Sequence, residues 1–291
     1  MNFNQLIYTR LASDENLCGK LAEYDGDPAI DHLEFANDQQ EGWHGKEQFP
    51  RVSYRYSMQA DPERSSAGAL HITVYVNGDI GLATEIEECI RRRLANVVMK
   101  PDEEPPFCVS WMRTDAFQVE GSTIFYKNIM FDILDFPDQI TTDPDPVLAV
   151  NTFLKGLDTA MFLIGYDEMG DTYEPDDLNP AVYVSATAYS KRMESYALVF
   201  VDVDISIHIL APSAEYRRKW VRALYNELFR RGEIPYVDEA SEHPMLIDDI
   251  KVLNTADYMK QGQIRMKCMY TMQSARLAKE DNPLNHGFFN E

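Results

Sequence analysis

The sequence lacks the short motifs that mark the common classes of enzyme. It contains no GxxxxGK[ST] phosphate loop, no GxGxxG fingerprint, no GxSxG nucleophile turn and no HExxH zinc motif. No two of its six histidines lie at positions i and i+4 of an expected helix, and its four cysteines form no CxxC pair. We therefore expect no catalytic residue, no cofactor, no metal ion and free cysteines in a reducing compartment.

Long apolar runs and basic residues are also scarce. No stretch approaches the roughly 20 apolar residues of a membrane span, and the first residues lack the basic start and apolar core of a signal peptide. Only 27 Lys and Arg face 48 Asp and Glu, a net charge of −21. This balance disfavours binding to nucleic-acid phosphates or anionic membranes. It suits a soluble protein, or one that lines a channel through which DNA slides without binding. We expect the protein to be made in the cytoplasm.

One short pattern is written twice in the chain. The stretch TDAFQVEG at 114–121 is matched 141 positions later by TADYMKQG at 255–262. Each ends in glycine, Gly121 and Gly262, and we expect each glycine in a turn between two strands, where the backbone must be permissive.

The periodicity of the apolar residues gives the same order of elements on both sides of this repeat. It predicts helix, strand, strand, helix, strand, strand in each half. In the first half these are 4–12, 49–56, 69–76, 82–94, 107–113 and 122–134; in the second they are 149–157, 179–186, 196–210, 216–228, 248–254 and 263–272. The two central helices match at an offset of 134 positions, with apolar residues every fourth position: Leu82, Ile86, Ile90 and Leu94 against Tyr216, Trp220, Leu224 and Leu228.

The fold class that follows is α+β, with two related modules that each pack helices on an antiparallel sheet. We expect the first module at 1–136, an acidic proline-containing linker at 137–147, the second module at 148–273 and a C-terminal arm at 274–291. The collinear order of the matches favours an internal duplication. The alternative is two unrelated α+β modules in one chain.

Two groups of residues invite a metal site, and a plainer interpretation exists for each. The segment 165–177 gathers six acids, but their spacing does not fit a calcium-binding EF-hand loop, so a solvated acidic loop is the expectation. His71 and His208 fall in strands of corresponding position, without a cluster of cysteines or carboxylates beside them. We expect both to be ordinary strand residues.

The candidate functional residues are therefore interface residues. Trp43 and His44 lie in a polar, glycine-flanked loop, where an aromatic side chain either anchors a partner or folds back on its own module. Phe288 and Phe289 lie in the C-terminal arm, which would act as a hook for a partner. The turns at Gly121 and Gly262 complete the set.

The first half resembles the tail-terminator or tail-completion proteins of tailed bacteriophages. The resemblance is carried by LIYTRLASDENL at the start, the proline-led strand FPRVSYRY, the strand and helix in HITVYVNGDIGLATEIEECIRRRL, and the strand pair SWMRTDAF and IFYKNIMFDI. It covers residues 4–136, and extends to 148–273 through the internal repeat.

The resemblance implies a structural protein of the virion that forms a ring on the last ring of the tail tube. Such a ring ends tube polymerisation and presents a surface to the neck or head connector, and DNA passes through its lumen without sequence-specific binding. The expected partners are copies of the chain itself, the tail tube and neck or connector proteins. This chain departs from the usual member by having two modules, which leaves three or six copies per ring open.

Other functions fit parts of the sequence. Another neck, connector-stopper or baseplate subunit is the nearest. An enzyme with an acidic, metal-dependent site near 165–177 and an acidic adaptor for a basic partner belong to different classes.

Overall fold

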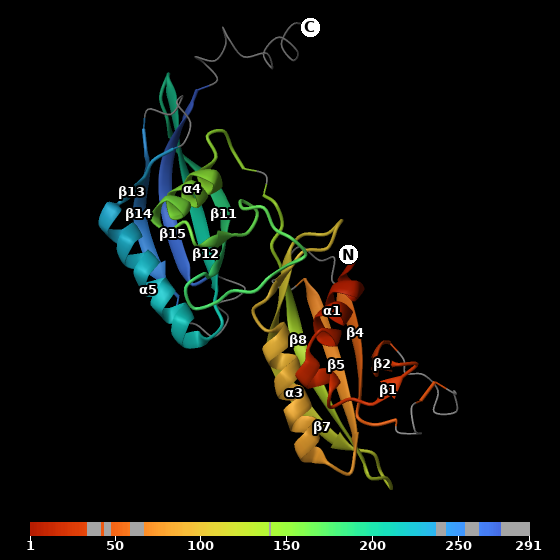
Figure 1. Ribbon diagram of the computed structural model, residues 1–291. Helices are drawn as coiled ribbons and strands as arrows, with labels where there is room; N and C mark the ends of the chain where they lie inside the picture. Colours follow the sequence, from red (N-terminus) through yellow and green to blue (C-terminus); the bar gives the residue numbers. More distant parts are fainter. Residues whose placement is uncertain are drawn as a thin grey trace, which may run out of the picture. The chain divides into compact units, whose positions relative to one another are not determined.

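The structure is a computed structural model that describes residues 1–33, 42–43, 48–58, 67–139, 141–236, 243–253 and 262–274. The chain divides into two compact units (Figure 1). The first unit comprises Met1–Pro137 and Met169–Pro175, and the second comprises Asp138–Glu168 and Asp176–Glu291. The units differ from the predicted modules in that seven residues of the predicted second module belong to the first unit, and in that the predicted linker 137–147 is divided between the units after Pro137.

The first unit is built on a seven-stranded sheet. Its elements are α1 (Phe3–Ala12), α2 (Glu15–Cys18), β1 (Glu23–Tyr24), β2 (Asp27–Pro28), β3 (Ile30–His32), β4 (Arg51–Met58), β5 (Gly68–Asn77), α3 (Ile80–Leu94), β6 (Val98–Met99), β7 (Phe107–Gln118), β8 (Ile124–Asp135) and β10 (Thr172–Tyr173). The strand order is β10-β6-β7-β8-β5-β4-β3, and every pairing is antiparallel except that of β3 with β4. The two-residue strands β1 and β2 pair separately.

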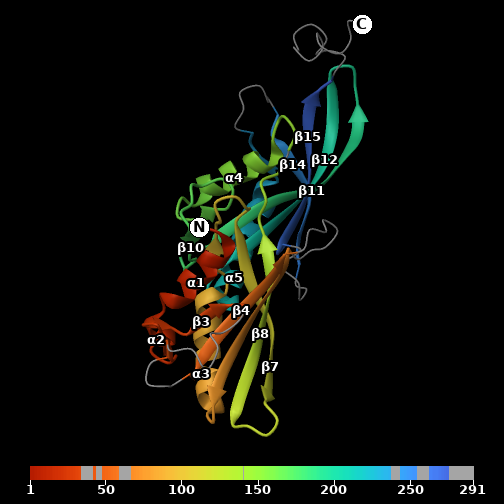
Figure 2. The same ribbon diagram turned by 90° about the vertical axis from the view of Figure 1, so that its right-hand side faces the viewer.

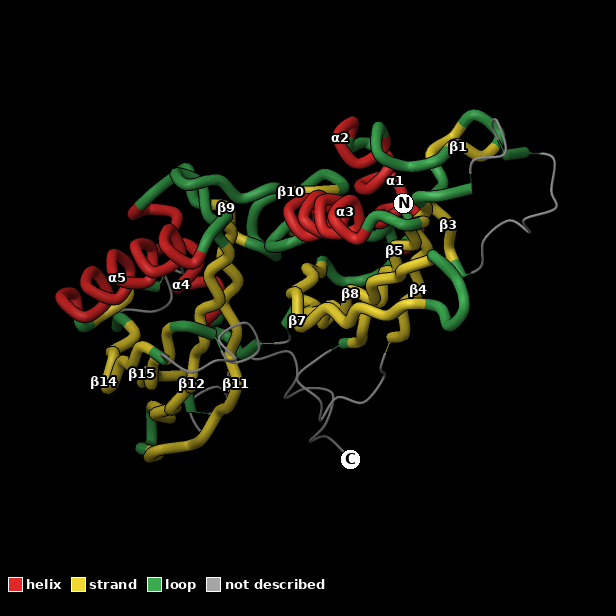
Figure 3. The backbone as a smooth tube through the Cα atoms, turned by 90° about the horizontal axis from the view of Figure 1, so that it is seen from below, coloured by secondary structure: helices red, strands yellow, loops and turns green. Residues whose placement is uncertain are grey.

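Helices α1 and α3 cover one face of this sheet, as the end-on view in Figure 3 shows. Alternate residues of β5 are completely buried against them, including Leu70, Ile72 and Val74. The alternation follows from the two-residue period of a strand, which sends successive side chains to opposite faces. The other face of the sheet carries no helix of the described part of this unit.

The second unit has a six-stranded sheet with the order β13-β14-β15-β12-β11-β9. Its elements are α4 (Pro146–Leu157), β9 (Phe162–Leu163), β11 (Ala181–Glu194), β12 (Leu198–Leu210), α5 (Ala214–Arg231), β13 (Glu233–Ile234), β14 (Met245–Val252) and β15 (Ile264–Gln273). Helices α4 and α5 lie on one face (Figure 3), and the β11–β12 hairpin continues past helix α4 (Figure 2). The core contains Val203, Ile205 and Ile207 from β12 with Leu224 and Leu228 from α5.

Side-chain caps fix where the helices begin. The Asp79 carboxylate accepts hydrogen bonds from the backbone N–H groups of Gly81 and Leu82, and Asp145 does the same for Val147 and Leu148. These bonds satisfy N–H groups that have no partner inside a helix. Helix α4 consequently starts at Pro146, within the residues that the sequence assigned to the linker.

The predicted order of the long elements and the α+β class agree with the structure. The helix faces are confirmed at Ile86, Ile90 and Leu94 in α3 and at Leu224 and Leu228 in α5, all of which are buried. The long strands run further than predicted, most of all β11, which continues to Glu194. No element was predicted between residues 12 and 49, yet β1, β2 and β3 lie there, because strands of two or three residues are too short to show a period.

Both repeated glycines adopt left-handed backbone. Gly121 lies between β7 and β8 and Gly262 lies just before β15, each with φ of +73°. The prediction of a permissive backbone at these positions is confirmed. The remaining residues that carry the written repeat in the second half, 255–261, lie outside the described residues.

We expect the substitution Gly121→Ala to lower the free energy of unfolding by about 1 kcal/mol, because a side chain is strained at positive φ. Gly262→Ala should cost about 2 kcal/mol, since its Cβ would in addition lie 3.0 Å from the Ile207 carbonyl oxygen, whereas Gly121 has open space. Chemical denaturation of the two variants measures the difference. Equal costs would show that the space around Gly262 adjusts freely.

Candidate interaction surfaces

The uncovered face of the first sheet carries a row of aromatic side chains. Tyr75, Tyr126 and Phe117 lie opposite one another on β5, β8 and β7, with ring centroids 5.8 Å and 5.2 Å apart. The guanidinium of Arg51 extends the row over the Tyr75 ring at 5.8 Å. Phe117, at the end of the row, is 49% exposed. Aromatic rings and arginine on an open face are typical of surfaces that bind other proteins.

A polar hollow of about 190 Å³ lies on the same face. Ser53, Arg55, His71 and Thr73 line it, together with Leu33, Tyr54 and Tyr75. Burial, with Arg55 and Arg113 nearby, lowers the pKa of His71, which therefore stays neutral at physiological pH. The lining contains no carboxylate, thiol or lysine, and it sets the imidazole of His71 among serine, threonine and tyrosine hydroxyl groups and the Arg55 guanidinium.

In each unit, one of the long strands with a partly open outer edge also carries exposed apolar side chains. Strand β7 pairs with β6 only at Phe107, and from 110 to 118 no described strand lies on that side. On β11 the short strand β9 pairs with Ala181 and Val182. The amide of Gln139 then accepts from the Ala186 N–H at 2.7 Å and donates to the Val184 carbonyl at 3.1 Å.

Beyond these contacts, residues 187–193 of β11 face no described strand on that side. Exposed apolar side chains follow both open edges: Trp111, Met112 and Phe117 on β7, and Tyr189 and Met193 on β11. Open edges with apolar side chains are prone to pair with other strands.

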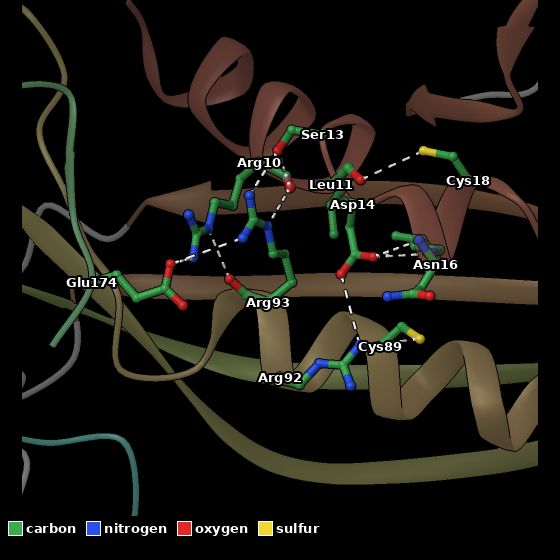
Figure 4. Close-up of polar contacts among 11 residues, drawn as sticks. Arg10, Leu11, Ser13, Asp14, Asn16, Cys18, Cys89, Arg92, Arg93 and Glu174 are labelled. Atoms are coloured by element: carbon green, nitrogen blue, oxygen red, sulfur yellow. Dashed lines mark hydrogen bonds and ion pairs between the residues drawn. The ribbon is translucent and has the colours of Figure 1, made fainter. Parts of the chain in front are cut away.

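Two arginines hold the segment Met169–Pro175 on the first unit (Figure 4). The side chain of Arg10 at the end of α1 is nearly buried and donates to a Glu174 carboxylate oxygen at 2.5 Å. Arg10 and Arg93 also donate to each other's backbone carbonyl groups, at 2.9 Å and 3.2 Å. Arg93 donates further to the Ser13 hydroxyl at 2.9 Å. We call Arg10, Arg93 and Glu174 the arginine cradle.

The sequence did not reveal this cradle. Glu174 is one of the six acids of 165–177. Arg93 lies in the last turn of α3, where basic residues are favourable because of the helix dipole. Arg10 and Glu174 are 164 positions apart, so their contact leaves no local signal.

We expect Arg10→Met to lower the free energy of unfolding of the first unit by about 2 kcal/mol, because it leaves the Arg93 carbonyl and Glu174 without their charged donor. Glu174→Gln should cost less than about 1 kcal/mol, since this carboxylate is 57% exposed and screened by water. Denaturation monitored by circular dichroism compares the two. A larger loss for Glu174→Gln would contradict the account.

Three of the four cysteines, Cys18, Cys108 and Cys268, have a raised pKa. All four are free. Burial raises the pKa of Cys108, and burial together with Asp248 and Asp204 raises the pKa of Cys268 to about 12. Burial and the Asp14 charge also raise the pKa of Cys18. A thiol that stays protonated at neutral pH is a poor nucleophile and a poor metal ligand.

Three of the six acids of 165–177 serve separate structural contacts. Asp167 forms an ion pair with Lys155 at 2.7 Å and accepts from the Leu163 N–H. Asp176 accepts from the backbone and side chain of Asn179. Glu174 lies in the arginine cradle. Within the described residues, no group of three or more His, Cys, Asp or Glu side chains is arranged to hold a metal ion.

Of the predicted interface residues, Trp43 is covered by its own unit. Its ring is 8% exposed and packs with Tyr24 at a centroid distance of 5.0 Å, with the Arg51 guanidinium 5.7 Å away. The structure therefore shows Trp43 folded back on its own unit, which is one of the two arrangements expected from the sequence. Its side chain is not exposed to anchor a partner. Gly121 and Gly262 lie in separate units. His44, Phe288 and Phe289 lie outside the described residues.

Comparisons with known proteins find no family and one weak structural similarity. No family model matches the sequence, and no curated protein matches it. Among solved structures, the chain is similar to one chain of the virion of a native gene transfer agent particle, with a TM-score of 0.35 and 14% sequence identity. The match covers 46% of this chain and 94% of the other. A TM-score of this size does not establish a shared fold.

None of the helices in the described part of the chain has the length and apolar character of a membrane span.

Proposed function

We propose that the chain is a structural protein of a virion that forms a ring at the end of a phage tail tube. In this proposal the ring stops tube polymerisation and provides the surface to which the neck or head connector joins. The role is structural rather than enzymatic. The proposal rests on the resemblance of residues 4–136 to tail-terminator proteins.

The observation that carries the proposal is the strand order of the two sheets. From β6 to β3 the first sheet runs β6-β7-β8-β5-β4-β3, and the second runs β13-β14-β15-β12-β11-β9. Both place a helix before the short parallel strand and another after the first hairpin. We infer that the two units arose by duplication. Two like units in one chain can occupy two equivalent positions of a ring. Repetition of one head-to-tail contact then closes the ring.

Two further features support a ring over a catalytic role. The open strand edges and aromatic row supply surfaces for neighbours and for the tube, and the net charge of −21 suits a lumen that passes DNA without holding it. The proposed partners are further copies of the chain, the tail tube and neck or connector proteins. Another neck, connector or baseplate subunit is the second candidate, because it would use the same surfaces.

Electron microscopy of the purified protein, alone and mixed with tail tubes, tests the proposal. We expect rings of sixfold or pseudo-sixfold symmetry, or extra density at one end of each tube. Rings that never cap a tube would favour the neck or baseplate role. Single chains of 33.4 kDa that leave the tubes unchanged would overturn the proposal.

A further inference from the structure

The first unit completes its sheet with a strand from outside its own run of sequence. The connection between β9 and β11 spans residues 164–180, and its middle part adds β10 to the outer edge of β6. Thr172 and Tyr173 pair with Met99 and Val98, and the Lys100 N–H donates to the Asp171 carbonyl at 2.9 Å. The arginine cradle then fixes Glu174 beside this edge. Strand β6 is thus covered on both sides, by β7 and by β10.

Strand β13 occupies the same place in the second unit but lacks that cover. It follows α5 as β6 follows α3, and it pairs with β14 as β6 pairs with β7. The second sheet ends at β13, and no described strand lies on its outer side.

A groove of about 360 Å³ lies beside β13. Phe153, Gly156 and Leu157 of α4 form one wall, and Arg231 at the end of α5 and Tyr236 after β13 form the other. The lining is mainly apolar, with the Arg231 guanidinium 5.5 Å from the Phe153 ring. In the first unit the ends of the two helices hold Glu174. In the second unit the ends of the two helices frame this groove.

The chain contains one connection of matching type. Residues 33–50 join β3 to β4 as residues 164–180 join β9 to β11, and the two connections are 18 and 17 residues long. The sequence of 33–50 carries four acids, Glu34, Asp38, Glu41 and Glu47, against one lysine. The last turn of α5 next to the groove carries two arginines, Arg230 and Arg231. Of the two, Arg231 lines the groove, where it is also paired with Glu227 at 2.9 Å, so the groove offers one arginine to an acidic segment.

We propose that the segment 34–41, within the connection 33–50 of a second copy of this chain, docks on the outer edge of β13 and in the groove beside it. It adds a strand there as β10 does on β6, by main-chain hydrogen bonds along an exposed edge. The contact is head-to-tail, because the first unit of one copy binds the second unit of the next. The inference deepens the proposed ring by naming the contact between its subunits.

Gly156→Arg tests the groove. A Cβ at Gly156 meets no atom within 4 Å, so a side chain can start there without a clash, and arginine favours a helix more than glycine does. Leu148→Arg is the control, because Leu148 is 45% exposed on the same helix and does not line the groove. By light scattering after gel filtration, we expect the wild type and Leu148→Arg to associate to multiples of 33.4 kDa, and Gly156→Arg to remain a monomer.

A second variant tests the docking segment. Residues 34–41 are replaced by a glycine-serine segment of equal length, which leaves the groove intact. We expect this variant to be a monomer alone and to form a 1:1 dimer with Gly156→Arg, because each supplies the half that the other lacks. Circular dichroism of each variant verifies that it is folded.

Four outcomes would overturn the inference: association of Gly156→Arg like the wild type, association of the glycine-serine variant like the wild type, failure of the mixture to dimerise, or a wild type that stays monomeric. If only the glycine-serine variant still associates, another segment fills the groove, such as 237–242 or 275–291. Rings or capped tubes formed by Gly156→Arg would refute this contact and leave the proposed function standing. A dimer from the mixture, together with a wild type that never caps tubes, would support this contact and refute the proposed function.

Discussion

Replacing Lys127 by methionine is expected to lower the free energy of unfolding of the first unit by about 3–5 kcal/mol. The Lys127 ammonium lies on β8 and is 9% exposed. It donates to a Glu87 carboxylate oxygen at 2.9 Å and to the Thr84 hydroxyl at 2.8 Å, both on α3. Methionine fills similar volume but leaves the buried Glu87 charge without its main partner. An uncompensated buried charge costs far more than a lost surface pair.

The loss should depend on pH. Burial by itself raises the pKa of Glu87, but hydrogen bonds from Lys127 and Thr114 outweigh it, and the pKa is lowered in the folded protein. A lowered pKa contributes stability above the ordinary glutamate value of about 4.3, and this contribution is lost as the pH falls through the folded value. In Lys127→Met, fewer groups stabilise the Glu87 carboxylate against the cost of its burial. Protonation of Glu87 removes the buried charge and therefore restores part of the variant's stability. The gap between wild type and variant should therefore narrow from pH 7 to pH 4.5.

Two further variants test whether the loss of stability comes from the unpaired Glu87 charge or from the substitution of a lysine in general. Lys219→Met removes an exposed pair with Glu215 on α5, 61% and 69% exposed, and should leave the denaturation midpoint unchanged. The double variant Lys127→Met, Glu87→Leu should recover most of the loss, because an apolar pair of similar volume tolerates burial. If the double variant were as unstable as Lys127→Met alone, the loss would come from packing rather than from the stranded charge.

Lys127 also shows how far the sequence could be interpreted. The apolar period of β8 runs through Phe125, Ile129, Phe131 and Ile133, and Lys127 stands on the same face as an interruption. The period was enough to predict the strand and the buried face. The partner that makes a buried lysine tolerable lies 40 positions away on α3, and no local pattern links the two.

The same distinction applies to the candidate interaction surfaces. Repeated apolar residues predicted the helices and long strands because burial imposes a period on each element. Edge contacts have no such period. Strand β10 is two residues long and pairs through its backbone, so Thr172 and Tyr173 needed no particular side chain to be there. Trp43 was ambiguous from sequence for a different reason, because an aromatic residue in a polar loop serves equally as an exposed anchor or as a cover.

Leu94→Ala and Leu228→Ala are expected to lower stability by about 2–5 kcal/mol each, but in different units. Both side chains are completely buried, at corresponding positions of α3 and α5, and they belong to separate apolar cores. Truncation removes apolar contacts and leaves a cavity that the surrounding helix and sheet fill only in part. Scanning calorimetry should show two transitions in the wild type. Leu94→Ala should lower one transition temperature and Leu228→Ala the other.

Leu178→Ala provides the matched control, because this leucine is 71% exposed and its truncation creates no cavity. The pattern of shifts matters more than their size. Two like units that each bury their own core can unfold one at a time, as the proposed duplication requires. A single transition that both core variants lower equally would mean that the two cores unfold as one cooperative body. The strand order would then still be repeated, but neither unit would be a module with a stability of its own.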